Sequence, residues 1–182
     1  MVDQLVSTKI QSAAFFALAG ATDDRLELID GEVIVMPSPS VLHQELLLRL
    51  ALWFHSLISI GRLFVAPLDV RIDDENIVQP DLLWVAPNGK AVITDQRIEG
   101  APDLVIEILS EATLRRDKTV KFLLYEKSGV REYWLVDPAG TIEVWTLSDK
   151  EYAHVGTYKS GDTLASPLLS VSLDLTQVFT TI

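Results

Sequence analysis

Asp-Leu-Val-Ile-Glu-Ile-Leu-Ser, residues 103–110, is an apolar, strand-like segment with a charged residue near its centre. Its density of branched aliphatic side chains predicts a strand that is buried on both faces of a sheet. Glu107 lies within this segment, and burial of an isolated carboxylate costs several kcal/mol of desolvation free energy. A cation, a hydrogen-bond donor or a metal ion is therefore expected to face Glu107.

Two further features of the sequence supply partners for Glu107. Upstream, Asp81 follows a proline and opens a second apolar segment, and downstream a basic helix carries Lys118 and Lys121. If the two strands are neighbours, the carboxylates of Asp81 and Glu107 approach closely enough to share one divalent cation. Because the ligands would be oxygen atoms, Mg²⁺ or Mn²⁺ is the expected cofactor. Two strand-borne acids and a nearby lysine are the parts of a magnesium-dependent phosphodiesterase site.

Composition limits the classes of protein to which the chain can belong. With 182 residues and 48% hydrophobic residues, it is expected to form one globular domain over residues 1–182. It contains no cysteine, which excludes disulfides and thiolate metal sites, and no apolar run is long enough to span a membrane. The first residues lack a signal-like segment, so we expect a cytoplasmic location and no membrane partner.

The charge balance bears on any nucleic-acid partner. The formal net charge is −11, which opposes tight non-specific binding to a polyphosphate. Local charge can differ from the global balance, and residues 114–121 hold four basic groups against one acid. The net charge therefore disfavours strong non-specific DNA binding but does not exclude a nuclease.

The pattern of apolar residues and turn signals predicts a mixed sheet flanked by helices, an α/β (α+β) fold with an N-terminal helix and hairpin. Asp30-Gly31 predicts the turn of that hairpin, and Ser40 predicts the start of a long apolar helix that stops at Gly61. The expected helices cover residues 8–19, 41–60 and 111–128, and the expected strands cover residues 26–36 as a hairpin, 62–72, 81–85, 104–109, 130–136, 141–147 and 152–158.

Several stretches of the sequence together resemble a known family. These stretches are residues 27–33 (Glu-Leu-Ile-Asp-Gly-Glu-Val) with Pro37-Ser38-Pro39, Pro80-Asp81 followed by residues 102–110, residues 116–122 (Arg-Asp-Lys-Thr-Val-Lys-Phe) and residues 129–138 (Gly-Val-Arg-Glu-Tyr-Trp-Leu-Val-Asp-Pro). In them the chain is similar to a restriction-endonuclease-like family that is greatly expanded in cyanobacteria and belongs to the PD-(D/E)xK nuclease superfamily. The resemblance runs from about residue 10 to the C-terminus, and no single motif carries it. It implies a restriction-endonuclease-like core with a metal site on the sheet.

The resemblance also implies roles for individual residues. The usual lysine of the superfamily lies two positions after the strand acid, where this chain has Leu109. The resemblance therefore implies that the lysine has moved to the following helix, with Lys121 as the first candidate and Lys118 as the second. Glu32 matches the early acid of the family, which commonly serves as an accessory metal ligand.

Each assignment has a structural alternative. Glu107 could pair with an arginine or with backbone amides, and Asp81 could be a turn aspartate after proline. Lys121 lies four residues after Asp117, which is the spacing of an ordinary solvated ion pair on a helix. Glu32 could equally be an exposed turn residue.

The first function that the sequence supports is a Mg²⁺- or Mn²⁺-dependent endonuclease that hydrolyses phosphodiester bonds, with DNA as the expected substrate. Asp81 and Glu107 would bind the metal, and Lys121 would position the attacking hydroxide with help from Glu32. His43 and Gln44, at the start of the long helix, are candidate accessory residues, although a lone histidine is more often an ordinary packed or surface residue.

A homodimer is expected because cleavage of a duplex by a small domain generally calls for two active sites. Trp134 and Trp145 are either part of such an interface or core residues. The second class of function is a catalytically inactive nuclease fold that serves as a binding or assembly module, which the net charge of −11 and the displaced lysine favour. A third is a nuclease that acts on a protein-bound or structured nucleic acid, with the partner providing the basic surface.

Overall fold

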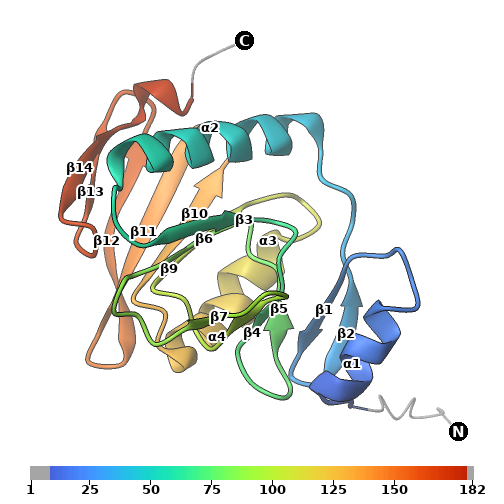
Figure 1. Ribbon diagram of the computed structural model, residues 1–182. Helices are drawn as coiled ribbons and strands as arrows, with labels where there is room; N and C mark the ends of the chain where they lie inside the picture. The colour runs from blue at the N-terminus through green and yellow to red at the C-terminus, as the bar shows by residue number, and fades with distance from the viewer. Residues whose placement is uncertain (1–8, 180–182) are drawn as a thin grey trace, which may run out of the picture.

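Figure 1 shows the computed structural model of the chain, which describes residues 9–179. The described chain forms two six-stranded mixed sheets and a small two-stranded sheet. The strand order is β12-β11-β10-β9-β6-β3 in the central sheet and β2-β1-β5-β4-β8-β7 in the second sheet. The predicted mixed sheet with flanking helices is therefore confirmed.

The helical segments are α1 (Ser12–Ala19), α2 (Val41–Leu57), α3 (Leu114–Arg116), the π-helical turn η1 (Asp117–Lys121), α4 (Phe122–Ser128) and the 3-10 turn η2 (Leu175–Gln177). The strands are β1 (Leu26–Ile29), β2 (Glu32–Val35), β3 (Arg62–Val65), β4 (Val70–Arg71), β5 (Ile77–Val78), β6 (Leu82–Val85), β7 (Val92–Ile93), β8 (Ile98–Glu99), β9 (Leu104–Ile108), β10 (Glu132–Asp137), β11 (Thr141–Ser148), β12 (Glu151–Lys159), β13 (Thr163–Ser166) and β14 (Val171–Asp174).

The strand that carries Glu107 is β9, which lies inside the central sheet between β10 and β6. It runs parallel to β10 and antiparallel to β6, and all of its residues are buried. Leu104, Ile106 and Ile108 pack in the core cluster beneath α2. Val105 packs on the opposite face, toward the second sheet. The predicted buried strand and the alternation of its faces are confirmed.

The helix α2 covers one face of the central sheet (Figure 1). Ser40 caps it as predicted, because its Oγ accepts a hydrogen bond of 3.2 Å from the backbone N–H of residue 43. The helix ends at Leu57 rather than at Ile60. The indole N–H of Trp84, on β6, donates to the carbonyl oxygen of Ile60 at 3.0 Å. This hydrogen bond holds residues 58–60 against β6 in a non-helical conformation.

The predicted strand at residues 62–72 is wrong as a single element. The chain forms β3 in the central sheet and β4 in the second sheet, with residues 66–69 between them. Pro67 lies in this break and has no backbone N–H for a strand ladder. The crossing between sheets at this point lets the second sheet pack on the Val105 face of the central sheet.

The predicted helix at residues 111–128 begins at Leu114 and contains the π-helical turn η1, which was not predicted. It ends as predicted at Gly129, whose φ of +86° lets the chain leave the helix in the left-handed conformation. The N-terminal helix begins at Ser12, and Thr8, its predicted first residue, lies outside the described residues.

None of the helices formed by residues 9–179 combines the length and the apolar character that a membrane span requires.

Glu132 attaches the C-terminal segment to the central sheet. Its Oε1 accepts hydrogen bonds from the indole N–H of Trp134 at 2.8 Å and from the hydroxyl of Ser166 at 2.6 Å. Its Oε2 accepts one from the backbone N–H of Leu168 at 2.9 Å. Burial raises the pKa of Glu132 above its usual value. Trp134 is fully buried and Trp145 is half-buried, so Trp134 is a core residue and not part of an interface.

Substitution of Gly61 tests the turn that follows α2. Gly61 has a φ of +76°, and a Cβ atom there would lie 2.5 Å from Nε1 of Trp84 and 2.6 Å from the carbonyl oxygen of Val85. Gly161 also has a positive φ, of +91°, but nothing lies within 4 Å of its Cβ position, so Gly161→Ala isolates the backbone strain. Urea denaturation is expected to show a loss of about 3 kcal/mol for Gly61→Ala and about 1 kcal/mol for Gly161→Ala. Equal losses would contradict the close packing at Gly61.

Candidate active site

Lys121 lies at the centre of a buried group of charges. Its ammonium Nζ is 2.8 Å from Oε1 of Glu27, 3.0 Å from Oε1 of Glu107 and 3.8 Å from Oδ1 of Asp117. The side chain of Lys121 is only 1% exposed, and the three acidic side chains are 0%, 5% and 3% exposed in the same order. Charged side chains are almost never buried this deeply unless they are paired. These four residues, which we call the Lys121 cluster, therefore depend on one another.

Three separate elements build the Lys121 cluster. Glu27 comes from β1 of the second sheet and Glu107 from β9 of the central sheet, whereas Asp117 and Lys121 begin and end the turn η1. Both ends of this turn are buried and residues 118–120 are exposed. Turns of π-helix are uncommon and often occur at functional sites. The burial of Asp117 and Lys121 excludes the alternative that they form a solvated ion pair.

Two buried tyrosines form hydrogen bonds with residues of the Lys121 cluster. The hydroxyl of Tyr125 donates to Oε1 of Glu107 at 2.8 Å, and the hydroxyl of Tyr133 donates to the backbone carbonyl of Asp117 at 3.1 Å. Burial and the nearby carboxylates raise the pKa of both phenols well above the usual value. Both tyrosines therefore act as hydrogen-bond donors that position their neighbours.

The electrostatics of the cluster are unbalanced, because three carboxylates face one ammonium. Burial raises the pKa of Glu107 well above its usual value, and the charge of Lys121 offsets only part of that effect. Burial also raises the pKa of Asp117. Burial alone would lower the pKa of Lys121, but the three carboxylates together raise it above its usual value. Lys121 is therefore a fixed positive charge and not a general base.

Asp81 lies at the same end of the central sheet as Glu107. Strand β6 pairs antiparallel with β9, and their register, continued by one residue, sets Asp81 opposite Glu107. Oδ2 of Asp81 accepts a hydrogen bond of 2.7 Å from the backbone N–H of Ile108 and lies 3.1 Å from Nε2 of His43. The structure thus brings together the two strand acids, as the sequence analysis expected, and adds His43 to them.

A cleft of about 690 Å³ opens beside the Lys121 cluster, at the C-terminal ends of β9 and β10. Its lining includes the two strand acids, Asp117, Lys121 and His43. In sheets with parallel strands, ligands commonly bind outside the carboxyl ends of those strands. The charged groups therefore border the space that a substrate would occupy in this cleft.

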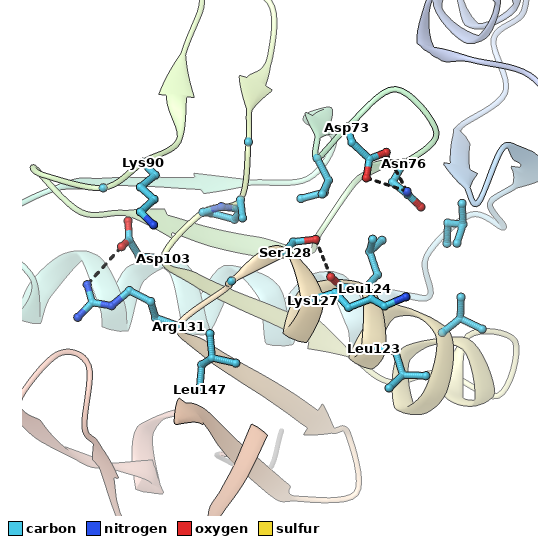
Figure 2. Close-up of a pocket in the computed structure, with 18 of the residues that line it drawn as sticks. Asp73, Asn76, Lys90, Asp103, Leu123, Leu124, Lys127, Ser128, Arg131 and Leu147 are labelled. Carbon is cyan, nitrogen blue, oxygen red and sulfur yellow. Dashed lines mark hydrogen bonds and ion pairs between the residues drawn. The ribbon is translucent and has the colours of Figure 1, made fainter. Parts of the chain in front are cut away.

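A second cleft of about 1160 Å³ lies at the opposite ends of β9 and β10 and is shown in Figure 2. Asp103 lies in it and accepts a hydrogen bond of 3.3 Å from Arg131. The basic side chains that line it, those of Lys90, Lys127 and Arg131, are exposed, whereas the basic side chain of the Lys121 cluster is buried. We therefore place the candidate active site in the smaller cleft.

Three residues that the sequence analysis proposed for the site lie outside it. Glu32 is exposed on β2, directly after the hairpin turn, and so is at the rim of the second sheet. Gln44 is exposed on α2. The ammonium of Lys118 lies 2.7 Å from Oε1 of Glu143 in a partly exposed ion pair. None of these three side chains lines the smaller cleft among the residues described.

Glu27 is the acid that the sequence analysis missed. It lies on the same hairpin as Glu32 but on the first strand, where it is fully buried. A sequence signal was present, because Glu27 lies between Leu26 and Leu28 in a predicted strand. A carboxylate in an apolar strand is the same pattern that drew attention to Glu107.

The oxygen atoms of the site suit a hard divalent cation. Among residues 9–179, no group of three or more His, Asp and Glu side chains is arranged to hold a metal ion. Mg²⁺ does not require such a group, because it is usually held by one or two carboxylates together with water and substrate phosphate oxygens. Oε2 of Glu27 and Oδ1 of Asp117 are buried without a hydrogen-bond partner in the described chain, so the cluster has unused acceptor capacity. Asp81 and Glu107 supply carboxylate oxygens to the same cleft, and carboxylate oxygen is the ligand type that a cation of this kind prefers.

Comparisons with known proteins bear on the family and the fold. The family model Uma2, described as "Putative restriction endonuclease", matches residues 12–177. The crystal structure of a protein from Anabaena variabilis, described as a "putative nuclease belonging to DUF820", is similar with a TM-score of 0.70 and 23% sequence identity, over 87% of this chain and 92% of that chain. At this identity the likeness shows the fold, and it confirms the predicted nuclease-like architecture. No curated protein matches the sequence.

Replacement of the buried ammonium tests whether the cluster is a mutually dependent unit. Lys121→Met leaves three buried carboxylates without their cation, and the free energy of unfolding is expected to fall by about 3–5 kcal/mol. The control Lys118→Met removes a partly exposed pair with Glu143 and is expected to change stability by less than about 0.5 kcal/mol. Urea denaturation measures both, and a Lys121→Met protein as stable as the control would contradict the account.

Proposed function

The chain belongs to the Uma2 family of restriction-endonuclease-like proteins, and from this we propose that it is a metal-dependent endonuclease that hydrolyses phosphodiester bonds of DNA. One observation carries the proposal beyond the family. The carboxylate of Glu107 on β9, that of Asp81 directly before the neighbouring β6, and the buried, positively charged Lys121 line a single cleft. Binding of a cation, positioning of water and stabilisation of a charged phosphate all require groups of this kind.

Each charged group has a distinct proposed role. Asp81 and Glu107 would hold Mg²⁺ or Mn²⁺, and such an ion would supply Lewis-acid stabilisation of the charge that develops on the phosphate. Lys121 keeps its proton, so its ammonium hydrogen-bonds the attacking water and offsets negative charge in the transition state. Glu27 and Asp117 hold that ammonium in place.

His43 is proposed as a positioning residue for Asp81. Its Nε2 lies 3.1 Å from Oδ2 of Asp81, close enough to fix the orientation of that carboxylate. Its Nδ1 is buried and has no hydrogen-bond partner in the described chain. Groups that orient a metal-binding carboxylate typically contribute about 10- to 100-fold to affinity or activity.

The proposed role of Lys121 accounts for the departure from the superfamily pattern. Leu109 occupies the position of the usual lysine, and it is buried in the core between the sheets. Lys121 reaches the strand acid from the helix instead, at 3.0 Å from Oε1 of Glu107. The positive charge of a lysine therefore still lies beside the strand acid Glu107, but it comes from the helical segment and not from β9.

DNA is proposed as the substrate, and the local charge supports it. The net charge of −11 weakens long-range attraction to a polyphosphate. The helix α3 opposes this effect, because Arg115 and Arg116 directly follow Leu114, which lines the smaller cleft. Because a single site cuts one strand at a time, we propose that cleavage of both strands is carried out by a homodimer.

A catalytically inactive nuclease fold is the second candidate function. It is favoured by the ion pairing of the cluster, in which the ammonium of Lys121 is already surrounded by carboxylates. In that case the cluster serves only to join the two sheets, and the cleft binds a partner without cleavage.

Plasmid cleavage distinguishes the two functions. With Mg²⁺ or Mn²⁺, the wild-type chain is expected to convert supercoiled plasmid DNA to open-circular and linear forms, and EDTA is expected to stop the reaction. Glu107→Gln is expected to lower the rate by about 100-fold or more. The matched control Glu143→Gln changes an acid that pairs with Lys118 away from the cleft, and its rate is expected to stay within about twofold of wild type.

Circular dichroism confirms that both variants are folded. Equal rates in Glu107→Gln and wild type, or no cleavage by wild type with either metal, would contradict the proposal and favour the inactive fold. If an RNA of the same sequence is cleaved and the plasmid is not, the proposed active site stands and the substrate is RNA instead of DNA.

A further inference from the structure

The outer face of α2 exposes a row of large apolar side chains. Val41, Leu48 and Leu52 are 78%, 60% and 62% exposed, and Ile60, just after the helix, is 64% exposed. The opposite face of the helix packs on the central sheet, and none of the described elements lies over the outer face (Figure 1). Exposed large apolar side chains gathered on one face of a helix are typical of an interaction site.

The residues of this outer face have a symmetric spacing. Glu45, Leu48, Leu52 and His55 follow one another at intervals of three, four and three residues. This is the spacing of the a and d positions of a coiled coil. Because the order of intervals is the same in both directions along the helix, the row can pair with an antiparallel copy of itself.

We propose that α2 binds the α2 of a second copy of this chain in an antiparallel orientation, and that this contact forms a two-fold symmetric homodimer. In antiparallel coiled coils an a residue packs in the same layer as a d residue of the other helix. Leu48 then lies opposite Leu52 of the partner subunit, and Glu45 lies opposite His55 of the partner subunit. Each of these layers occurs twice because of the symmetry.

Charge supports a second copy of the same chain as the occupant. Two molecules with a net charge of −11 repel one another over most of their surfaces. On α2 the single acid, Glu45, is balanced by Arg49, so this face has no formal charge to oppose pairing. The Glu45 carboxylate and the imidazole of the partner's His55 form a complementary hydrogen-bonding pair at each end of the row.

The length of the contact sets its expected strength. A helix of 17 residues is about 25 Å long, and the contact extends slightly beyond it where Val41 approaches the partner's Ile60. One helix pair of this length buries less surface than an obligate dimer, so we expect a dissociation constant in the range of about 1–100 µM. The pairing does not depend on the proposed nuclease activity, and it is measured without substrate.

Sedimentation velocity of the full chain tests the proposal. Between about 1 and 200 µM the wild-type protein is expected to shift from a monomer of 20.2 kDa to a dimer of twice that mass. Leu48→Glu places a charge in two symmetric layers and is expected to raise the dissociation constant by about tenfold or more. The control Leu123→Glu changes a leucine of α4 that is 56% exposed, and it is expected to dimerise like wild type.

A wild-type protein that stays monomeric over the whole range would overturn the proposal. Equal dimerisation of Leu48→Glu and wild type would place the interface elsewhere and would also overturn it. Thermal melts followed by circular dichroism show that the variants are folded, which is expected because the substituted side chains are exposed.

Disulfide trapping tests the antiparallel register separately. The chain has no cysteine, so Leu48→Cys and Leu52→Cys each carry a single thiol. After oxidation of an equimolar mixture, peptide mapping is expected to find residue 48 linked to residue 52 more often than either residue linked to itself. Predominant 48–48 and 52–52 links would indicate a parallel pair and would overturn the proposed register.

Discussion

The ammonium of Lys121 is the point at which the two sheets and the helical segment packed on them meet. It contacts Glu27 from the second sheet, Glu107 from the central sheet and Asp117 from its own turn, all within 3.8 Å. Removal of one partner from a buried ion pair leaves an uncompensated charge that costs several kcal/mol. The lengths of these ion pairs therefore limit how far β1, β9 and the turn η1 can move relative to one another. The ion pairs of the Lys121 cluster therefore also fix the positions of the neighbouring Asp81 and of the smaller cleft.

Stability alone does not require these four charged side chains in the core. Well-packed apolar residues of similar volume are often as stabilising as a buried ion pair, or more so. Here three carboxylates surround one ammonium, and two of their oxygens lack a hydrogen-bond partner in the described chain. Local departures from the rules of core packing are expected at functional sites. The excess negative charge is what a site needs if a divalent cation and a phosphate are to enter from the cleft.

Particular residues show which parts of this arrangement could be predicted from sequence. Asp81 and Glu107 could be predicted because strand alternation fixes their faces, and because their strands carry the apolar signal of a buried sheet. Glu27 carried the same local signal, but β1 belongs to a different sheet, and the contact between sheets depends on long-range packing. The family resemblance favoured Glu32 instead, which lies beyond the hairpin turn and is exposed.

The sequence analysis ranked Lys121 ahead of Lys118, but the turn that buries Lys121 was not predicted. The turn η1 buries Lys121 and leaves Lys118 exposed, and a π-helical turn is not encoded by hydrophobic periodicity. The break at residues 66–69 was missed for a related reason. The apolar residues on both sides suit a strand equally well. Pro67 was the sequence signal for a break, but the placement of β3 and β4 in different sheets depends on long-range packing.

The most direct test of this account is the position of a divalent cation in crystals of the wild-type protein soaked with Mn²⁺. Anomalous scattering at the manganese edge locates the ion independently of the coordinates. A peak is expected between Asp81 and Glu107, at about 2.1 Å from a carboxylate oxygen of each. An anomalous map without a peak in the smaller cleft, or with manganese only in the larger cleft beside Asp103, would contradict it.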